Sequence, residues 1–148
     1  MEYEFILRIF VAAILGGLIG LEREYRSKEA GFRTHFLVAL GSALFMIVSA
    51  YGFSEINLVE PQRWDVSRIA AQVVSGIGFI GAGTIIFRKT ENMVSGLTTA
   101  AGLWVTAAMG LACGGGMYML SIASTLLVLV GLEAFNYFLH KFDRYKKE

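Results

Sequence analysis

Five apolar stretches, each long enough to cross a lipid bilayer, limit what this chain can fold into. Each holds 17 to 23 residues, and they cover residues 5–21, 36–53, 69–87, 97–113 and 117–139. A helix that spans the hydrocarbon core needs about 20 apolar residues, with a range of about 17 to 25. We therefore predict an all-α fold, a compact bundle of five transmembrane helices that forms a single domain over residues 1–148 in a lipid bilayer.

The connections between these stretches are short, with 14, 15, 9 and 3 residues in chain order. Short connections make successive helices antiparallel neighbours and leave no room for a catalytic domain outside the membrane. The sequence also has no Ser/His/Asp set and no HExxH motif, and its single cysteine, Cys113, cannot form an internal disulfide. We expect neither an enzyme nor a cofactor.

Basic residues are distributed unevenly between the two sides of the predicted bundle. Thirteen basic and twelve acidic residues give a net charge of only +1, which favours no nucleic-acid partner. Ten of the basic residues lie in segments 22–35, 88–96 and 140–148, whereas the segments on the other side contain only Arg63 and Arg68. The positive-inside rule then predicts an amino terminus outside and a carboxyl terminus in the cytoplasm.

Glycine is abundant, with 17 residues, most of them inside the apolar stretches. Small residues let transmembrane helices approach closely. The expected helix-packing positions are Gly16, Gly20, Gly76, Gly78, Gly81, Gly83 and Gly96. The densest run, residues 75–84, allows two interpretations. Either its helix lies centrally against several neighbours, or the helix is unwound there and presents carbonyl groups to a cation.

Glu133 and Arg8 are charged residues within predicted spans, where charge is costly and often functional. Glu133 follows Met117 by sixteen residues, roughly 24 Å along a helix. Its carboxylate either has a raised pKa or a cationic partner in the core, or it lies near enough to the interface to be solvated or paired with Lys141 or Arg88. Arg8 lies one turn from Glu4 near a helix end and can snorkel to the surface.

Further polar residues lie at the ends of the predicted spans. Mixed charges after the first span, including Glu22, Glu24 and Arg33, ordinarily form a solvated ion-pair cluster. The spacing of Asp65, Arg68 and Gln72 places them on one helical face, where Asp65 can cap the helix and Gln72 can bond to another helix.

Thr99 follows Gly96 at the start of the fourth span, where a hydroxyl can bond back to a carbonyl of its own helix. Oxygen groups of these kinds are ligands that Mg²⁺ accepts, but they also join helices. The candidate ion- or partner-binding residues are Glu22, Glu24, Arg33, Asp65, Arg68, Gln72, Thr99 and Glu133.

Four sequence blocks resemble the MgtC/SapB family closely. They are Gly16-Gly-Leu-Ile-Gly-Leu-Glu-Arg-Glu24, Gly31-Phe-Arg-Thr-His-Phe-Leu-Val-Ala-Leu-Gly-Ser42, the run from Arg68 to Thr84 and the run from Ser95 to Gly110. The resemblance covers roughly residues 8 to 135. The family's motif positions fall on Glu22, Arg23, Glu24, Arg33, Thr34, Asp65, Arg68, Gln72, Gly76, Gly78, Gly81, Gly83, Gly96, Leu97, Thr99 and Trp104.

The resemblance implies a multi-pass protein of the bacterial inner membrane, associated with growth in low magnesium. It further implies a family whose members are associated, in some pathogens, with survival inside macrophages. It also implies that some members act on other membrane proteins, including the ATP synthase. This sequence ends nine residues after its last predicted span, whereas magnesium-responsive members carry a soluble C-terminal domain. It also has Ser95 where those members tend to have arginine. Both features resemble the short SapB-type branch.

Two hypotheses for function follow. The first is a regulatory protein that is linked to magnesium or envelope homeostasis and acts through contacts with another inner-membrane protein. The second is a transporter of Mg²⁺ or another small solute, with Gln72 and Glu133 in its pathway. Because five helices are few for enclosing a pathway, we expect a homodimer.

Overall fold

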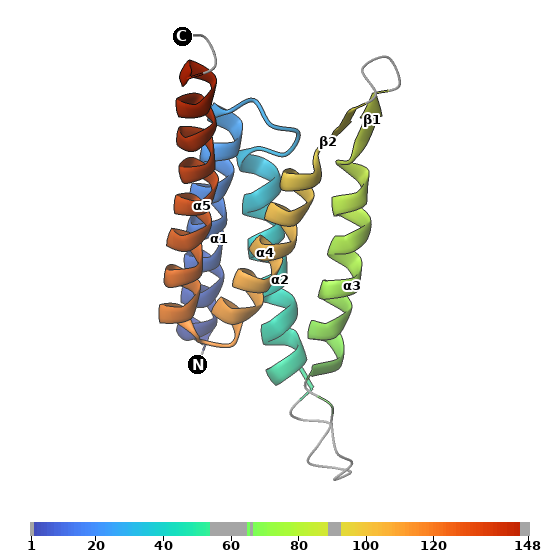
Figure 1. Ribbon diagram of the computed structural model, residues 1–148. Helices are drawn as coiled ribbons and strands as arrows, with labels where there is room; N and C mark the ends of the chain where they lie inside the picture. Colours follow the sequence, from blue (N-terminus) through green and yellow to red (C-terminus); the bar gives the residue numbers. More distant parts are fainter. Residues whose placement is uncertain (1, 54–64, 66, 89–92, 146–148) are drawn as a thin grey trace.

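The computed structural model describes residues 2–53, 65, 67–88 and 93–145, with side chains for residues 2–53, 65, 67–85 and 94–134. Within these residues the chain forms five helices, α1 (Glu2–Tyr25), α2 (Phe32–Tyr51), α3 (Ser67–Gly83), α4 (Leu97–Gly114) and α5 (Tyr118–Tyr145). Strands β1 (Ile86–Arg88) and β2 (Met93–Ser95) pair in an antiparallel hairpin between α3 and α4. The helices lie side by side in one bundle (Figure 1).

Three of the described helices, α1, α2 and α4, are long and apolar enough to cross a membrane. Helix α3 has 17 residues, a length of about 25 Å at about 1.5 Å per residue. This is less than the hydrocarbon thickness of about 30 Å. In α5 the apolar part with described side chains covers Tyr118–Ala134. The fold is thus that of a helical membrane protein, whereas the number of five spans stays a prediction.

The third predicted span extends beyond the helix that forms there. It was expected to reach Phe87, but α3 ends at Gly83 and β1 begins at Ile86. At the junction, the Thr84 hydroxyl donates to the carbonyl oxygen of Gly81 at 2.7 Å. The residues that follow are β-branched and aromatic, which favours extended backbone. An apolar run does not by itself distinguish a helix from a strand, so the hairpin was not predicted.

Helix α4 occupies the centre of the bundle, because it contacts each of the other four helices. The main core cluster lies where α1, α2 and α4 meet and consists of Ala12, Leu15, Ile19, Ala39, Ala43, Met109 and Cys113. The lone cysteine is fully buried in this cluster. Helix α3 packs on α4 and α2 at one side of the bundle (Figure 1). The expectation that the glycine-rich third helix is central is therefore wrong for the single chain.

Glycines allow α2 to lie in backbone contact with α1 on one side and α4 on the other. A Cβ atom at Gly16 would overlap Ala39, and one at Gly20 would lie 2.7 Å from the Cα atom of Phe32. On α4, a Cβ atom at Gly110 would lie 2.5 Å from the Ala39 carbonyl oxygen. These separations are too short for any side chain. Glycine at these positions is thus required by the close approach of the helices.

Arg8 joins the start of α1 to the connection between α4 and α5. Its Nη1 atom donates to the carbonyl oxygen of Gly114 at 2.9 Å, and its Nε atom lies 3.2 Å from Oε1 of Glu4. The same Glu4 oxygen accepts the hydroxyl of Tyr118 at 2.9 Å. Only 13% of the Arg8 side chain is exposed. Arg8 therefore satisfies a carbonyl at the end of α4, and it does not snorkel freely.

Candidate functional site

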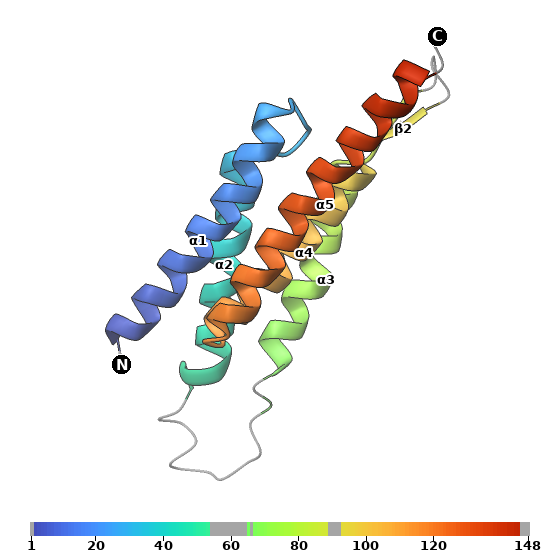
Figure 2. The ribbon, with the colours of Figure 1, turned by 60° about the vertical axis from the view of Figure 1, so that its left-hand side comes forward.

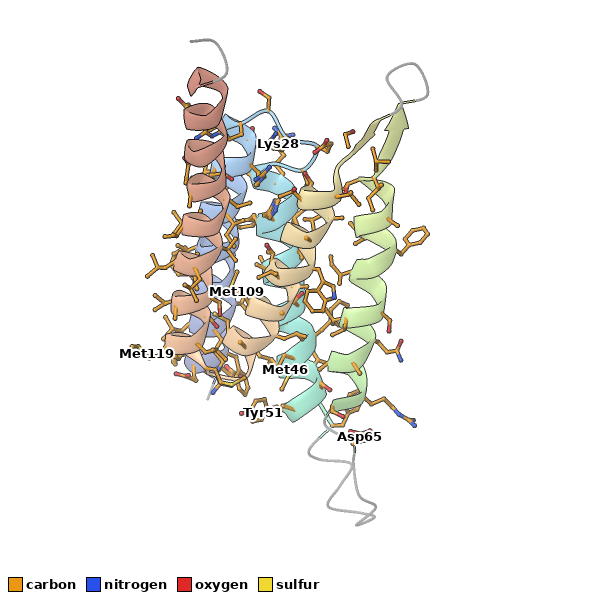
Figure 3. The ribbon with its side chains drawn as sticks, viewed as in Figure 1. Lys28, Met46, Tyr51, Asp65, Met109 and Met119 are labelled. Atoms are coloured by element: carbon orange, nitrogen blue, oxygen red, sulfur yellow. The ribbon has the colours of Figure 1, made fainter. Side chains whose placement is uncertain are left out.

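The predicted site residues divide between the two ends of the bundle. The α1–α2 loop (residues 26–31), the β1–β2 hairpin and the C-terminal turns of α5 lie at one end, which we call the hairpin end; the last turns of α5 extend beyond the loop (Figure 2). The opposite end carries the first turn of α3. Figure 3 labels Lys28 at the hairpin end and Asp65 at the other. The candidates therefore do not converge on one site.

Glu24 connects α1 to α2 through the backbone. Its Oε2 atom accepts the N–H of Phe32, the first residue of α2, at 2.7 Å. The N–H groups of a first helical turn have no partner within the helix, and Gly31 at the cap position has no side chain to offer one. Glu24 supplies this partner from the preceding helix and thereby closes the loop between α1 and α2.

Glu22 and Arg23 form a buried pair at the end of α1. The Nη1 atom of Arg23 lies 3.4 Å from Oε2 of Glu22, and the two side chains are only 4% and 10% exposed. Among the described residues, neither carboxylate oxygen of Glu22 nor the Nε atom of Arg23 has a hydrogen-bond partner. The expectation of a solvated cluster is wrong here. Buried charges are costly unless they are paired and hydrogen-bonded. The buried pair of Glu22 and Arg23 therefore makes the hairpin end a candidate for a functional site.

Glu133 is held by Arg26, which follows the last turn of α1. The Nη2 atom of Arg26 donates to both carboxylate oxygens of Glu133 at 2.7 Å. About half of the Glu133 side chain is exposed. The side chains of the partners considered from sequence, Lys141 and Arg88, lie outside those that the structure describes. The cationic partner expected for Glu133 is present, but it comes from the α1–α2 connection.

Thr99 forms a hydrogen bond to the α1–α2 loop. Its hydroxyl donates to Oε2 of Glu29 at 2.6 Å, so the expected bond to its own helix is not formed. A bond of that kind does occur about two turns further along α4, where Thr106 donates to the Gly102 carbonyl oxygen at 2.8 Å. The hydrogen bond from Thr99 lowers the pKa of Glu29, with smaller contributions from the backbone and from Lys28 and Arg23. Glu29 is therefore ionised at neutral pH.

Asp65, Arg68 and Gln72 lie at the start of α3. Oδ1 of Asp65 accepts the N–H of Ser67 at 3.0 Å and its hydroxyl at 2.6 Å. These hydrogen bonds lower the pKa of Asp65, and they make it the cap that the sequence predicts. Arg68 and Gln72 are exposed and form no side-chain hydrogen bond within the described part of the chain. The same holds for Arg33 on α2.

Three of the four glycines of α3 have open space beside them, but they do not share one face: Gly76 and Gly78 lie about 200° apart around the helix, and Gly76 lines a pocket toward α2. We call the side that carries Gly78 the open face of α3. A Cβ atom added at Gly76, Gly78 or Gly83 would meet nothing within 4 Å, whereas one at Gly81 would contact Ala100 of α4. The side chain of Phe79 beside them is 86% exposed. The helix is continuous from Ser67 to Gly83, which argues against the unwound segment considered from sequence. Neither of the two sequence interpretations describes this helix.

A pocket of about 460 Å³ separates α3 from α2 along part of their length. Gln72 and Ser42 are its polar side chains, and its other lining residues are apolar or glycine, including Gly76. Within the described residues, no group of three His, Cys, Asp or Glu side chains is placed to hold a metal ion. The oxygen groups named as possible magnesium ligands are thus spread over the bundle.

Sequence reasoning did not single out Arg26, Glu29 or His35. His35 is fully buried on α2, with Nδ1 3.0 Å from the Gly31 carbonyl oxygen and no partner for Nε2 among the described residues. Arg26 was counted only among the basic residues of the connection 22–35, and Glu29 was not considered. The sequence did contain a signal for them. The connection between α1 and α2 is short, so its charged side chains lie close to the ends of neighbouring helices.

The model of the MgtC family matches residues 9–141. The chain is 55% identical over 136 residues to "Putative magnesium transporter YhiD" of Escherichia coli K12, covering 92% of this chain and 62% of that protein. It is 44% identical over 129 residues to Protein MgtC of Salmonella typhimurium LT2, covering 87% and 52%. It is 40% identical over 136 residues to Protein SapB of Bacillus subtilis 168, covering 90% and 57%. The chain thus spans less than two thirds of each of these relatives. No solved structure matches it significantly.

Proposed function

The chain belongs to the MgtC family, and from this premise we propose that it is a regulatory protein of the bacterial inner membrane. In this proposal it has no enzymatic activity. It acts in magnesium or envelope homeostasis by contacting another membrane protein through the open face of α3. The Escherichia coli relative is named a putative magnesium transporter, which supports the link to magnesium, and the open face of α3 is the observation that carries the proposal.

The argument rests on the cost of glycine in a helix. A glycine in a helix interior is less favourable than alanine by about 1 kcal/mol. At Gly16, Gly20 and Gly110 close contact with α2 requires it. At Gly78, on the open face of α3, nothing in the described chain does. A transmembrane helix of a second protein, packed against this face, would explain why glycine is present there, because small residues permit close approach of transmembrane helices.

A photo-crosslinking experiment in living cells tests the proposed contact. A photoreactive amino acid replaces Phe79 on the open face, and the matched control replaces Leu127 on α5, which is 73% exposed. We expect position 79 to capture another membrane protein in cells grown in low magnesium. Adducts identical to those from position 127 would contradict the proposal. Capture of a second copy of this chain would instead support the homodimer that the transport alternative requires.

Complementation gives a functional readout of the same face. In a strain that lacks its own homologue, Gly78→Leu fills the open face, where the Cβ atom would meet no described atom within 4 Å. Ala123→Leu on exposed α5 is the control. We expect Gly78→Leu to abolish growth in low magnesium and Ala123→Leu to preserve it, at equal membrane levels. Normal growth with Gly78→Leu would exclude this face from function.

We propose the orientation predicted from charge, with five spans, the amino terminus outside and the hairpin end in the cytoplasm. Arg23, Arg26, Lys28 and Arg33 gather at the hairpin end, in agreement with the positive-inside rule. Reporter fusions test this directly. A fluorescent protein fused after residue 148 should fold and emit, whereas alkaline phosphatase at the same position should be inactive. The reverse pattern would overturn the orientation.

Transport of Mg²⁺ is the second candidate, favoured by the name of the Escherichia coli relative and by Gln72, which lines the pocket between α2 and α3. Glu133 does not line that pocket and is paired with Arg26. Proteoliposomes that contain a magnesium-sensitive dye separate the two candidates. We expect no flux above empty vesicles. A flux that falls in both Gln72→Leu and Glu133→Gln would favour transport, and a flux unchanged by Glu133→Gln would remove that residue from the pathway.

A further inference from the structure

A second pocket, at the hairpin end, has features that the proposed function does not use. It has a volume of about 610 Å³ and lies between the α1–α2 loop, the junction of β2 with α4, and α5. Its polar and charged lining side chains are Arg23, Lys28, Glu29, Ser95, Thr98 and Thr99. Figure 3 shows Lys28 in the loop at this end.

The amino terminus of α4 forms one wall of this pocket. Gly96 precedes the helix with φ of 88° and offers no side-chain cap. The first bond along the helix runs from the N–H of Ala100 to the carbonyl oxygen of Gly96 at 2.8 Å. The N–H groups of residues 97–99 come before this bond, and these residues line the pocket. Such groups and the helix dipole attract anions.

Arg23 is the second, independent feature that points to a ligand. Its side chain is only 4% exposed, it lines the pocket, and its Nε atom has no hydrogen-bond partner among the described residues. The hydroxyl oxygen of Ser95 is also buried at the pocket without a partner in the described chain. Arg23 is paired with Glu22 through its Nη1 atom at 3.4 Å, but a buried guanidinium Nε–H and a buried hydroxyl without hydrogen-bond partners are costly, because water no longer satisfies them. A bound oxyanion would accept hydrogen bonds from both.

The charges around the pocket favour an anion over a cation. Lys28 contributes a positive charge, the charge of Arg23 is offset by Glu22 at 3.4 Å, and the α4 terminus adds a partial positive charge. Glu29 is the carboxylate in the lining, and one of its oxygens already accepts the Thr99 hydroxyl at 2.6 Å. A divalent cation would meet two cationic side chains there. A tetrahedral oxyanion can accept bonds from several directions at once, which suits donors that lie on three different segments.

We propose that this pocket binds a phosphate group, held by Arg23, Lys28, Ser95 and the amino terminus of α4. The phosphate belongs either to the headgroup of a membrane phospholipid or to a small phosphate compound in solution. The two sources share the same chemistry, so the same residues serve both. This phosphate site does not depend on the partner contact proposed for α3. Failure of one proposal therefore leaves the other unaffected.

Binding is measured on the full chain in detergent. For soluble phosphate, Tm is compared in sodium phosphate and in sodium chloride of equal ionic strength, because a ligand of the folded state raises Tm. For a lipid, native mass spectrometry counts phosphatidylglycerol retained after purification, with a diglycosyl diacylglycerol that has no phosphate as the control lipid. A Tm rise identifies the soluble source, and selective retention of phosphatidylglycerol identifies the lipid source.

Two exposed residues of opposite charge make the test decisive. We expect Lys28→Gln to weaken phosphate binding by about threefold and Glu29→Gln to strengthen it. Arg68→Gln removes the same charge at the far end of the bundle and should leave binding unchanged. Arg23→Gln should weaken binding by tenfold or more, on the order expected for a buried charged hydrogen bond. If Arg23→Gln does not fold, Lys28→Gln and Glu29→Gln still decide the matter.

Three results would overturn the site. The first is no response to phosphate and no selective phospholipid retention in the wild-type chain. The second is binding that Lys28→Gln and Arg68→Gln weaken equally, which would indicate attraction by net charge alone. The third is a Tm increase from magnesium chloride that Glu29→Gln removes, which would make the pocket a cation site.

Discussion

Arg26 and Glu133 lie 107 residues apart in the chain, yet the Nη2 atom of Arg26 is 2.7 Å from both carboxylate oxygens of Glu133. The pair joins the end of α1 to α5, which otherwise packs mainly along α4 and the rest of α1. Both side chains are partly exposed, 32% for Arg26 and 52% for Glu133. Glu133 is therefore one half of an ion pair at the edge of the bundle.

Exchange of the two charges tests this pair. We expect Glu133→Arg alone to lower Tm, because it places two cations together. Adding Arg26→Glu should restore most of the loss by re-forming the pair in reverse. Thermal unfolding of the four proteins in detergent, analysed as a double-mutant cycle, measures the coupling. Additive effects of the two substitutions would show that the side chains do not interact.

The glycines of α1 and α3 should respond in opposite ways to the same substitution. We expect Gly16→Ala to destabilise the protein by about 1–3 kcal/mol, because the new methyl group overlaps Ala39 of α2 and forces the helices apart. Gly78→Ala meets nothing within 4 Å and should stabilise α3 by up to about 1 kcal/mol through helix propensity. Thermal unfolding followed by circular dichroism measures both. Equal losses in the two variants would contradict the open face of α3.

The cap at Asp65 should control the start of α3 and should depend on pH. Because its hydrogen bonds to Ser67 lower the pKa of Asp65 below the ordinary 3.8, the stabilisation is present at neutral pH. It is lost only as pH falls below that value. We expect Asp65→Ala to speed amide hydrogen exchange in the first turn of α3 severalfold at pH 7, while Asp65→Ser, which can also cap, retains most of the protection. Unchanged exchange in Asp65→Ala would show that the cap is dispensable.

The hydrogen bond between Thr99 and Glu29 should also give a pH signature. It lowers the pKa of Glu29 below the ordinary 4.5, so it stabilises the fold at neutral pH and loses that effect as pH falls through the lowered value. We expect Thr99→Val to lower Tm at pH 7 and the difference from wild type to shrink toward pH 3. Thr99→Ser retains the hydroxyl and should behave like wild type. A difference that is constant with pH would assign the effect to packing alone.

Helix positions were largely predictable from the sequence, because long apolar runs have few alternatives to a membrane helix. The starts of α2 and α4 lie within four residues of the expected ones. The end of α3 was not predictable, since Ile85–Phe87 are as apolar as the helix before them. Pairing with β2 makes Ile86–Arg88 a strand, and such pairing is not visible in the apolarity of the run itself.

The site was less predictable than the fold because its contacts join distant segments. Asp65 was recognised as a cap, since capping acts over two or three residues. Thr99 was identified as a polar residue, but its partner Glu29 lies 70 residues away. The glycines of α3 had the same appearance as those of α1, although Gly16 and Gly20 lie against α2 whereas a Cβ atom at Gly76, Gly78 or Gly83 would meet nothing within 4 Å. Composition identifies a residue's chemistry, whereas the three-dimensional packing determines which group it meets.

The contact of Arg8 with Gly114 has a consequence for the order of synthesis. Arg8 is made early, but the carbonyl oxygen that accepts its hydrogen bond comes 106 residues later, and Tyr118, the donor to the neighbouring Glu4, follows still later. During translation α1 therefore carries a charged pair whose distant partners do not yet exist. A nascent chain stalled before α4 would keep the contact between Arg8 and Glu4 but would lack the two later partners that join α1 to the α4–α5 connection.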